Sequence, residues 1–391
     1  MELMKGYKQT EIGVIPDDWK LMSIDQIFDF YSTSNYSKAQ MLSEGEIGCF
    51  HYGLIHSIAN NNYDIRNGLK YYVSKNQSKY EFLQNGDVIM VDASEDLSGV
   101  NKSIEISGIQ DKLYIAGLHT YLLRDRGYFQ NNFRGPILNS YSTKAQFCRL
   151  AVGMKVFGVS KQQLKKVLLP IPTKPEQIAI SNALSDADAY INSLEKLIKK
   201  KRQIKQGAMH ELLKPKDGWV QTILGNIVTI SKGQLITDNT RIDGDIPVIA
   251  GGKKPAYFHN KANRSQNTIT ISGSGASAGY VSFHDYPIFA SDCSTIEENN
   301  KISIHFIYYF LQSHQEKIFK MQTGGAQPHI HPSDLKPMQI AIPKKDIQLQ
   351  IANILIEMDK ELSLLEFKLD KGIKIKQGMI QNLLTGKIRL I

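Results

Sequence analysis

The stretch IPTKPEQIAISNALSDADAYINSLEKLIKKKRQIKQGAMHELL, residues 171–213, recurs later in the chain as IPKKDIQLQIANILIEMDKELSLLEFKLDKGIKIKQGMIQNLL, residues 342–384. The two copies align without a gap, and each matched pair of residue numbers differs by 171, as for Gln177 and Gln348. An ungapped internal repeat of this length indicates that one structural unit occurs twice. We therefore expect two equivalent long connectors in this chain.

Apolar residues recur in each copy at alternating steps of four and three, which is the spacing of a heptad seam on a helix. The seam positions are Ile180, Leu184, Ala187, Ile191, Leu194 and Ile198 in the first copy, and Ile351, Leu355, Met358, Leu362, Leu365 and Leu369 in the second. The matching stripes predict that the two helices pair with each other, antiparallel, as a coiled coil. A continuous helix over residues 175–213 would be ~58 Å long, which suits a spacer better than a core helix.

Several local features accompany the predicted helices. Each helix follows a proline-containing strand end, because the residue before a proline avoids helical geometry. Thr173 followed by Glu176 fits a capping box at the first helix start. Gly207 and Gly378 share one repeat position, where we expect a close helix crossing, a partner contact or a tolerated glycine. The basic run 199–202 forms either a solvated face or a contact with phosphate or a partner.

A second, weaker match opens each half, where Asp17, Trp19 and Ile27 correspond to Asp217, Trp219 and Ile227. Between the repeated segments the halves have diverged, and short β-branched runs broken by Gly, Asn, Asp and Ser indicate strands with elaborate loops. The predicted fold class is α+β, with two domains separated by a long antiparallel two-helix coiled coil and an internal pseudo-twofold repeat. An ordinary fusion of two unrelated domains is the alternative. The predicted boundaries are a first domain over 1–172, a first spacer helix over 173–214, a second domain over 215–343, and a second spacer helix with a C-terminal tail over 344–391.

The composition favours a basic globular protein. A length of 391 residues exceeds what one core usually supports, and 42% hydrophobic residues suffice for real cores. The formal net charge of +9 is compatible with a polyanionic partner. The cysteines, Cys49, Cys148 and Cys293, form no CxxC pair. The N-terminal residues lack a secretory pattern and no apolar run is long enough to cross a bilayer, so we expect a cytoplasmic protein with no membrane partner.

Candidate contacts to DNA lie in two pairs of loops. Residues 92–99 and 272–279 are small polar turns after equivalent strands, and residues 153–158 and 324–329 precede the two connectors. Backbone amides and lysines in such loops can meet phosphates, while Ser, Asn and Gln side chains can meet base edges. The alternative is that these loops only turn the chain. The candidate residues are Ser94, Asn101, Lys155, Lys161, Lys232, Lys253, Ser272, Ser274, Ser277, Gln327 and His329.

The sequence carries no recognisable catalytic or metal-binding motif. There is no phosphate-binding GxxxxGK[ST] loop and no methyltransferase Asn/Asp-Pro-Pro-aromatic motif, and the glycines of residues 273–279 have the wrong spacing for a dinucleotide. Asp359 with Glu366-Phe367-Lys368 superficially suggests a nuclease, but the predicted helix offers no cleft, so we interpret these residues as surface charge. The four histidines 305, 314, 329 and 331 lack companion Cys or clustered acids. We expect no catalytic residue, no metal site and no cofactor in this chain.

The repeated segments resemble those of a known family, the specificity subunits of Type I restriction–modification systems. The similar residues are the opening Ile12-Gly13-Val14-Ile15-Pro16-Asp17-Asp18-Trp19, the Ile-Pro-x-x-x-x-Gln starts at Ile171 to Gln177 and Ile342 to Gln348, the Lys-Gln-Gly…Leu-Leu ends, and the C-terminal segment from Leu383 to Arg389. The resemblance spans nearly the whole chain, although only the repeated parts are specific.

This resemblance implies a non-catalytic subunit of a Type I restriction endonuclease and DNA adenine methyltransferase complex. Each target-recognition domain would read one half of a bipartite site in double-stranded DNA, while the helices set the gap and dock two methyltransferase (modification) subunits. Restriction and translocase subunits would join through these, and S-adenosylmethionine, ATP and Mg would belong to the partners. The chain departs from the pattern at Ile347, where the first copy has Glu176, and its first domain lacks a clear Ser-Gly-rich loop, so DNA contacts there are not carried over.

Two other functions are compatible with the sequence. The first is a non-catalytic coiled-coil adaptor whose two diverged domains bind proteins. The second is an autonomous nuclease, which would cleave DNA with a metal alone, and we expect no such cleavage. The target bases and the spacer length are not readable from the residues, because they depend on loop geometry and DNA shape.

Overall fold

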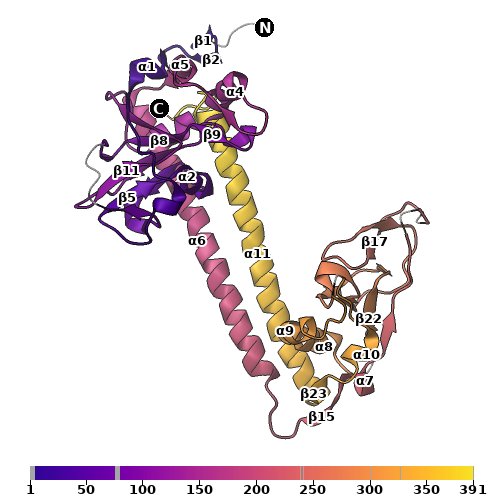
Figure 1. The fold of residues 1–391 in the computed structure, drawn as a ribbon. Helices are drawn as coiled ribbons and strands as arrows, with labels where there is room; N and C mark the ends of the chain where they lie inside the picture. Colours follow the sequence, from indigo (N-terminus) through magenta and orange to yellow (C-terminus); the bar gives the residue numbers. More distant parts are fainter. Residues whose placement is uncertain are drawn as a thin grey trace. The chain divides into compact units, whose positions relative to one another are not determined.

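The structure is a computed structural model that describes residues 5–74, 80–237, 239–240, 242–299, 301–325 and 327–390 (Figure 1). The chain divides into two compact units, one of residues 1–193 with 369–391 and one of residues 194–368. Each unit holds one α+β domain together with parts of two long helices, α6 (Lys174–Leu213) and α11 (Lys345–Leu383). The predicted fold class is confirmed.

The first domain is built on a five-stranded sheet of order β4-β12-β8-β10-β6 and a three-stranded sheet of order β11-β5-β7. Its strands are β1 (Tyr7–Thr10), β2 (Gly13–Pro16), β3 (Lys20–Ser23), β4 (Phe28–Tyr31), β5 (Ile47–Phe50), β6 (Asn62–Asp64), β7 (Tyr72–Val73), β8 (Val88–Val91), β9 (Ala93–Ser94), β10 (Ser103–Ser107), β11 (Leu113–Ala116), β12 (Thr120–Asp125), β13 (Phe157–Gly158) and β14 (Leu168–Ile171). Its helices are α1 (Ile24–Ile27), α2 (Tyr52–Ser57), α3 (Arg134–Leu138), α4 (Tyr141–Leu150) and α5 (Lys161–Leu164).

The second domain has a four-stranded sheet of order β16-β22-β19-β20 and a three-stranded sheet of order β18-β17-β21. Its strands are β15 (Val220–Ile223), β16 (Ile230–Lys232), β17 (Ile246–Ile249), β18 (Tyr257–His259), β19 (Thr268–Ser272), β20 (Val281–His284), β21 (Phe289–Ala290), β22 (Cys293–Glu297) and β23 (Gln339–Ile342). Its helices are α7 (Leu224–Ile227), α8 (Ile304–Ser313), α9 (Gln315–Phe319) and α10 (Pro332–Leu335).

The two domains share one topology although their sequences have diverged. The central antiparallel strands β4, β12, β8 and β10 correspond in order and direction to β16, β22, β19 and β20. Beside them, β5 pairs parallel with β11, as β17 does with β21. The strand that enters each long helix pairs with the strand that opens its domain, β14 with β3 and β23 with β15. The structure therefore contains the same scaffold twice.

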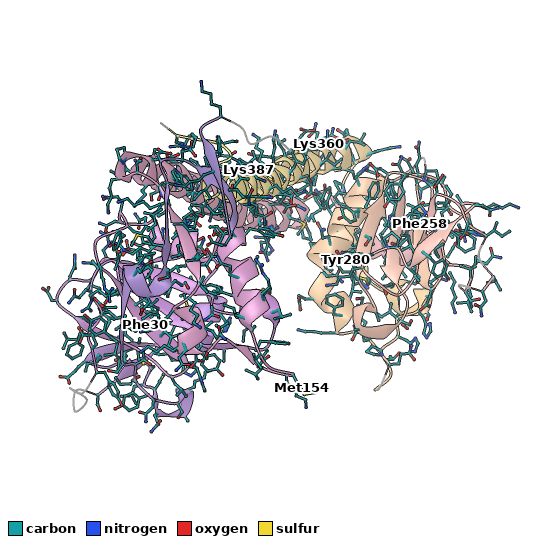
Figure 2. The ribbon with its side chains drawn as sticks, turned by 90° about the horizontal axis from the view of Figure 1, so that it is seen from above. Phe30, Met154, Phe258, Tyr280, Lys360 and Lys387 are labelled. Atoms are coloured by element: carbon teal, nitrogen blue, oxygen red, sulfur yellow. The ribbon has the colours of Figure 1, made fainter. Side chains whose placement is uncertain are left out.

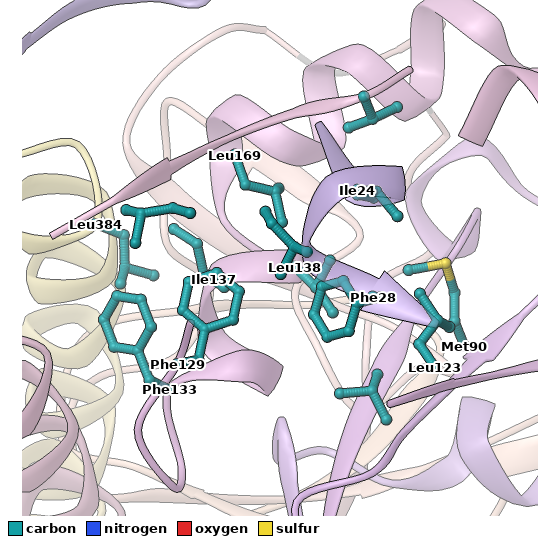
Figure 3. Close-up of a cluster of buried hydrophobic side chains, with 14 of the residues drawn as sticks. Ile24, Phe28, Met90, Leu123, Phe129, Phe133, Ile137, Leu138, Leu169 and Leu384 are labelled. Carbon is teal, nitrogen blue, oxygen red and sulfur yellow. The ribbon is translucent and has the colours of Figure 1, made fainter. Parts of the chain in front are cut away.

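The main core of the first domain extends onto the long helices. Phe28, Phe133 and Phe147 are fully buried in it, and Leu384 at the end of α11 belongs to the same cluster (Figure 3). Ile180 of α6 is buried there as well. The second domain repeats this arrangement with other residues, since its core includes Ile351 and Leu355 of α11 together with Met209 and Leu212 of α6. Burial of this apolar surface stabilises the start of each helix at ~25 cal/mol per Å².

Within each unit the two long helices run antiparallel. In the first unit Asp188 forms an ion pair with Lys376, and Gly372 lies against Tyr190. In the second unit Lys205 forms an ion pair with Asp359 at 2.5 Å, and Lys201 forms one with Glu361 at 2.7 Å. In these pairs, as the residue number along α6 rises, the number of the α11 residue that it contacts falls, which is the order expected of antiparallel helices.

The two lysine–aspartate pairs are equivalent positions of the repeat. Asp359 occupies in the second copy the place of Asp188 in the first, and Lys376 that of Lys205. The lysine side chains are only 13% and 16% exposed, although both continue the apolar seam. All twelve predicted seam residues are buried or half-buried, and Ile180, Leu184, Leu194, Ile198, Ile351, Leu355 and Leu362 are below 9% exposure. This burial agrees with the predicted seam, whose residue-by-residue pairing stays a prediction, and the two lysine–aspartate pairs add polar contacts along it.

A buried glutamine fastens the start of each long helix to its domain. The side-chain amide of Gln177 donates to the carbonyl of the proline five residues earlier at 2.9 Å, and its Oε1 accepts from the backbone N–H of Gln130 at 2.8 Å. Gln348 repeats both bonds, with its own proline at 2.9 Å and with the N–H of Ser303 at 2.9 Å. Both side chains are almost fully buried. The glutamine of each Ile-Pro-x-x-x-x-Gln start thus joins helix and domain.

The first unit has a second fastening, formed by Glu176, Trp19 and Arg389. The fully buried Glu176 accepts from Trp19 Nε1 at 2.8 Å and from Arg389 Nε at 2.6 Å. Arg389 also bonds both carboxylate oxygens of Asp18, at 3.0 and 2.8 Å, and holds the pKa of that carboxyl below its usual value. The second copy has Ile347 in place of the glutamate, so it has no such cluster.

Two local predictions about the helix backbone need correction. The capping box at the first helix start is wrong, because the Glu176 carboxylate bonds Trp19 and Arg389 instead of the backbone at Thr173. A close helix crossing at Gly207 and Gly378 is also wrong, since a Cβ at either position would meet nothing within 4 Å.

The helix charges are more than a solvated face. Two residues of the basic run 199–202 form ion pairs with α11, namely Lys201 with Glu361 and Arg202 with Glu366. Asp359, interpreted as surface charge from sequence, is instead shared between Lys205 and the hydroxyl of Tyr309, which donates to it at 2.7 Å. Of the described helices, none is long and apolar enough to cross a membrane.

The glutamine fastening yields a stability prediction. Gln348→Ala leaves the Ser303 N–H and a proline carbonyl unpaired in the interior, and an unsatisfied buried group costs about 1–3 kcal/mol. We expect faster hydrogen exchange at the Ser303 amide and along α8, with no change at the Gln130 amide in the first unit. Gln177→Ala should speed hydrogen exchange at the Gln130 amide in the first unit and leave exchange at the Ser303 amide unchanged.

The matched control is Gln350→Ala, two residues further along the same helix with an exposed side chain. It should leave exchange in both units unchanged. Equal protection of Ser303 in the Gln348→Ala and Gln350→Ala variants would contradict the fastening role.

Candidate nucleic-acid interface

Three segments that are far apart in sequence meet at one end of the central strands in each domain. In the first domain the N–H of Asp92, just after β8, donates to the carbonyl of His119, just before β12, at 3.2 Å. In the second, the N–H of Gly273 after β19 donates to the carbonyl of Asp292 before β22 at 3.0 Å. The segment after β5 joins the first group and the segment after β17 joins the second, through Gly117 N–H to Phe50 O and Ser291 N–H to Ile249 O. The equivalent strands bring equivalent loops together.

A hairpin from the end of each domain pairs with these loops. In the first domain Val152 and Gly158 exchange two backbone bonds of 3.0 and 3.1 Å, and β13 pairs with β9 in the loop after β8. In the second domain Thr323 and His329 do the same at 3.0 and 2.8 Å, and His329 bridges to Ser274 in the loop after β19. The two pairs of loops proposed from sequence as separate candidates thus lie together in each domain. Ala326 of the second hairpin lies outside the described residues.

We call these regions the first and second loop surfaces. The first consists of Tyr52–His56, Asp92–Gly99, His119 and Val152–Gly158, and the second of Gly251–Lys254, Gly273–Gly279, Asp292 and Thr323–His329.

The first loop surface encloses a cavity of about 680 Å³ with aromatic, imidazole and carboxylate walls. The Tyr52 ring lies edge-on to the rings of His119 and His56, with centroids 5.6 and 6.3 Å apart. His56 Nε2 is 3.2 Å from the carbonyl of Ala93. The lining residues are Tyr52, Gly53, His56, Ala93, Ser94, Glu95, Asp96, His119 and Val156. Such groups supply the hydrogen-bond donors and acceptors that read base edges.

Burial shapes the electrostatics of this cavity. Desolvation raises the pKa of Asp92, and the nearby His119 opposes that shift. The His119 Nδ1 atom is 3.3 Å from Asp92 Oδ1, an ion-pair distance without a directed hydrogen bond. Burial lowers the pKa of His51, whose Nδ1 accepts from the N–H of Gly53. The first loop surface therefore keeps both acidic and imidazole groups close to the loop backbone.

The second loop surface has different chemistry at the same place. Ser274 Oγ donates to the carboxylate of Asp292, and Lys253 Nζ lies 5.1 Å from the centroid of the Tyr280 ring. A Cβ on Gly273 would lie 2.8 Å from Asp292 Oδ1 and 3.1 Å from the Asp292 carbonyl oxygen, so a larger residue there would have to displace Asp292. The carboxylate of Asp292 thus stands at the position that the imidazole of His119 has in the first domain.

Eight of the predicted contact residues have accessible side chains. Lys155, Lys161, Lys232, Lys253 and Gln327 are exposed, and Ser274, Ser277 and His329 are half-buried. Most of them lie on the two loop surfaces, and Lys232 ends β16 opposite Ser294, close to Asp292. Lys161 lies apart, with its Nζ 5.1 Å from the centroid of the Phe30 ring on β4. DNA contact at these eight residues stays a prediction.

The side chains of Ser94, Asn101 and Ser272 are largely buried, at 5%, 1% and 4% exposure. Ser94 Oγ accepts from the N–H of Asp96, Asn101 donates to the carbonyl of Val91, and Ser272 Oγ donates to the carbonyl of Gly251. These bonds hold the loop backbone, and DNA contact at the three residues stays a prediction.

The structure adds residues that the sequence did not single out, above all Tyr52, His56, His119 and Asp292. Each lies in a loop near the end of a strand, and these loops are recognised as equivalent only when the two domains are compared strand by strand. His119 and Asp292, for example, occupy equivalent positions although their side chains are unrelated. A positive φ of 57° at His119 is a backbone sign of this special site.

The histidines of the second domain do not converge. His305 packs on Phe283 and His314 on Phe310, while the rings of His329 and His331 stack with centroids 6.2 Å apart. Over the residues that the structure describes, no group of three or more His, Cys, Asp or Glu side chains is arranged to hold a metal ion.

Comparison with known proteins gives one consistent result. The family model described as Type I restriction modification DNA specificity domain matches residues 16–206 and 216–374, so each match covers one domain and most of the helix that follows. A Mycoplasma pneumoniae protein named as a type I specificity subunit is 30% identical over 168 residues, which are 38% of this chain and 44% of that protein. The chain thus spans less than half the length of this relative.

Two other proteins match over nearly their whole length. The specificity subunit named for the MjaX type I restriction enzyme of Methanocaldococcus jannaschii is 24% identical over 425 residues, covering 99% of this chain and 97% of that protein. The crystal structure of the Type I restriction–modification S subunit from M. genitalium shares the fold, with a TM-score of 0.64 at 19% identity over 98% of both chains. Because the family model covers most of the chain in two copies, the chain belongs to the Type I restriction–modification DNA specificity family, as a specificity subunit and not a catalytic one.

Proposed function

We propose that each domain reads one half of a bipartite site in double-stranded DNA through its loop surface. One observation supports this proposal above all. The two domains share the same strand topology, but they carry different side chains at equivalent positions of their loop surfaces. A duplicated binding module for a single partner needs the same chemistry twice, whereas two readers of different bases need the same frame with different contacts. His119 beside Asp92 in the first domain, against Asp292 beside Ser274 in the second, is the clearest example.

The long helices serve in this proposal as the spacer between the half-sites and as the docking surface for two modification subunits. Restriction and translocase subunits join through those subunits, in the cytoplasm. S-adenosylmethionine, ATP and Mg are bound by the partners, since the transfer of a methyl group and DNA translocation are their reactions. Antiparallel pairing of repeated helices supports this arrangement, because protein symmetry of this kind matches DNA half-sites.

A domain graft tests the reading role. Residues 224–338 of the second domain replace residues 24–167 of the first, between β3 and β14, so that the chain carries the second reader twice. The equivalent bonds that Gln177 and Gln348 make to the domains favour correct seating of the graft. We expect the complex with modification subunits to lose the first half-site and to methylate an inverted repeat of the second, as mapped by sequencing methylated DNA.

The reciprocal graft, with the first reader twice, is the matched control and should give an inverted repeat of the first half-site. Methylation of the original site by either grafted chain would contradict the assignment of one half-site to each domain.

A helix insertion tests the spacer role. One heptad is inserted after Ser193 in α6 and one after Lys368 in α11, at the boundary between the two units and away from both domain cores. Seven helical residues add ~10 Å, which corresponds to ~3 base pairs at 3.4 Å each. We expect the methylated site to keep both half-sites and to widen its gap by about that amount.

Insertion of the heptad into α6 alone is the control. It would misalign the helices so that the pairs of Asp188 with Lys376 and of Lys205 with Asp359 cannot both form, and specific methylation should be lost. An unchanged gap after the double insertion would rule out the spacer role.

A further inference from the structure

The hairpin of the first domain exposes large apolar side chains to an unusual extent. Met154 is 98% exposed, Val152 81% and Val156 54%. Figure 2 shows Met154 at the tip of this hairpin, pointing away from the sheets of its domain. Single exposed apolar residues are ordinary, but three at alternate positions of one projecting loop mark a surface that something covers.

The shape of this hairpin is specified by the sequence. The two backbone bonds between Val152 and Gly158 close it, and β13 pairs it with β9. Phe157, at the base, packs against the main core of the first domain. Gly153 has a φ of 150°, and a Cβ there would lie 1.8 Å from the carbonyl oxygen of Val156, so this position requires glycine. Backbone hydrogen bonds, strand pairing and the packing of Phe157 therefore fix the position of the hairpin tip.

The charge next to the tip fits a polyanion. Lys155 lies between Met154 and Val156 and is exposed, and Arg149 at the end of α4 is exposed as well. Val156 also lines the cavity of the first loop surface, beside Ser94 and Asp96. The hairpin tip therefore combines the apolar side chain of Met154 with the positive charge of Lys155, and Val156 connects it to the first loop surface.

The described residues of the equivalent hairpin in the second domain lack this feature. Between Thr323 and His329 the described residues are Gly324, Gly325, Gln327 and Pro328, none of them a large flexible apolar side chain. A protein partner that docks in the same way on both domains would need the same tip twice. An apolar tip on one domain only fits a contact that differs between the half-sites, which is DNA.

We propose that Met154, supported by Val152 and Val156, is a wedge that enters between two base pairs of the first half-site and unstacks them, while Lys155 meets the adjacent phosphate. Apolar wedges of this kind, methionine included, insert between base steps and kink the duplex, and their energy depends on how easily the step deforms. The wedge makes the first domain select its half-site partly by DNA deformability, and the second domain reads without it. This inference rests on the proposed DNA-reading function.

The test uses the full chain assembled with its modification subunits and a duplex that contains the methylated site. 2-Aminopurine, which fluoresces when unstacked, replaces single adenines within and beside each half-site. We expect the wild-type complex to raise fluorescence at one step of the first half-site. Met154→Ser should abolish this rise and weaken specific binding by roughly tenfold, the usual scale for one lost base-pair contact. Val220→Ser, the same kind of change at an exposed apolar residue on β15 outside both loop surfaces, should leave the rise intact.

A second measurement changes the DNA and compares the wild-type and Met154→Ser complexes. An abasic position at the wedge step removes the stacking that the wedge has to break, so it should strengthen wild-type binding and leave the Met154→Ser complex unaffected. Because Met154 is exposed, the variant should unfold at the same temperature as the wild type.

Three results would overturn the wedge. One is specific binding by the wild type without any unstacking in the first half-site, which leaves the proposed function intact. Another is failure of the Met154→Ser chain to assemble with the modification subunits, which would place a protein on the tip. The last is equal binding of the wild-type complex to target and non-target DNA, which would contradict the proposed function and the wedge together.

Discussion

Two lysines on the seam of the long helices, Lys205 and Lys376, determine the register in which α6 and α11 pair. Each is largely removed from water and each is paired with an aspartate of the opposite helix. A half-buried ammonium without its partner is strongly unfavourable, so a polar pair on an apolar seam fixes register more than it adds stability. Because the two pairs are equivalent positions of the repeat, a slip of one helix along the other would break both at once. A purely apolar seam would tolerate such a slip.

Each domain is attached to the paired helices at the start of one long helix. Gln177 and Gln348 make the same two bonds, one within the turn that enters the helix and one to the domain. The loop surfaces are then carried by rigid strand ends on a scaffold that occurs twice. This separation of a shared frame from variable loops explains how the sequence between the repeats diverged without loss of the fold, since strand pairing needs backbone bonds and alternating burial but few particular side chains.

The long helices were predictable in their extent because apolar periodicity records burial directly, and α6 and α11 begin and end within a few residues of the repeated segments. Strands β8 and β19 were visible for the same reason. The common topology of the two domains was not, because it is encoded in which strands pair and not in which residues form them. Polar composition identified the loops correctly but not the direction of each side chain, as Asn101 illustrates, since it has a φ of 52° and its side-chain amide donates to the carbonyl of Val91 in the interior. His119 and Asp292 could be recognised as counterparts only once their strands were superimposed.

In the proposed function, one chain holds two independent readers of DNA at a distance set by its paired helices. Mapping the methylated positions in the DNA of cells that express this chain with its modification subunits tests this directly. We expect a single motif of two unlike half-sites separated by a gap of constant length and unconstrained sequence, with half-site centres about one helical turn, ~34 Å, apart. A continuous motif, or half-sites whose separation varies from place to place, would contradict it.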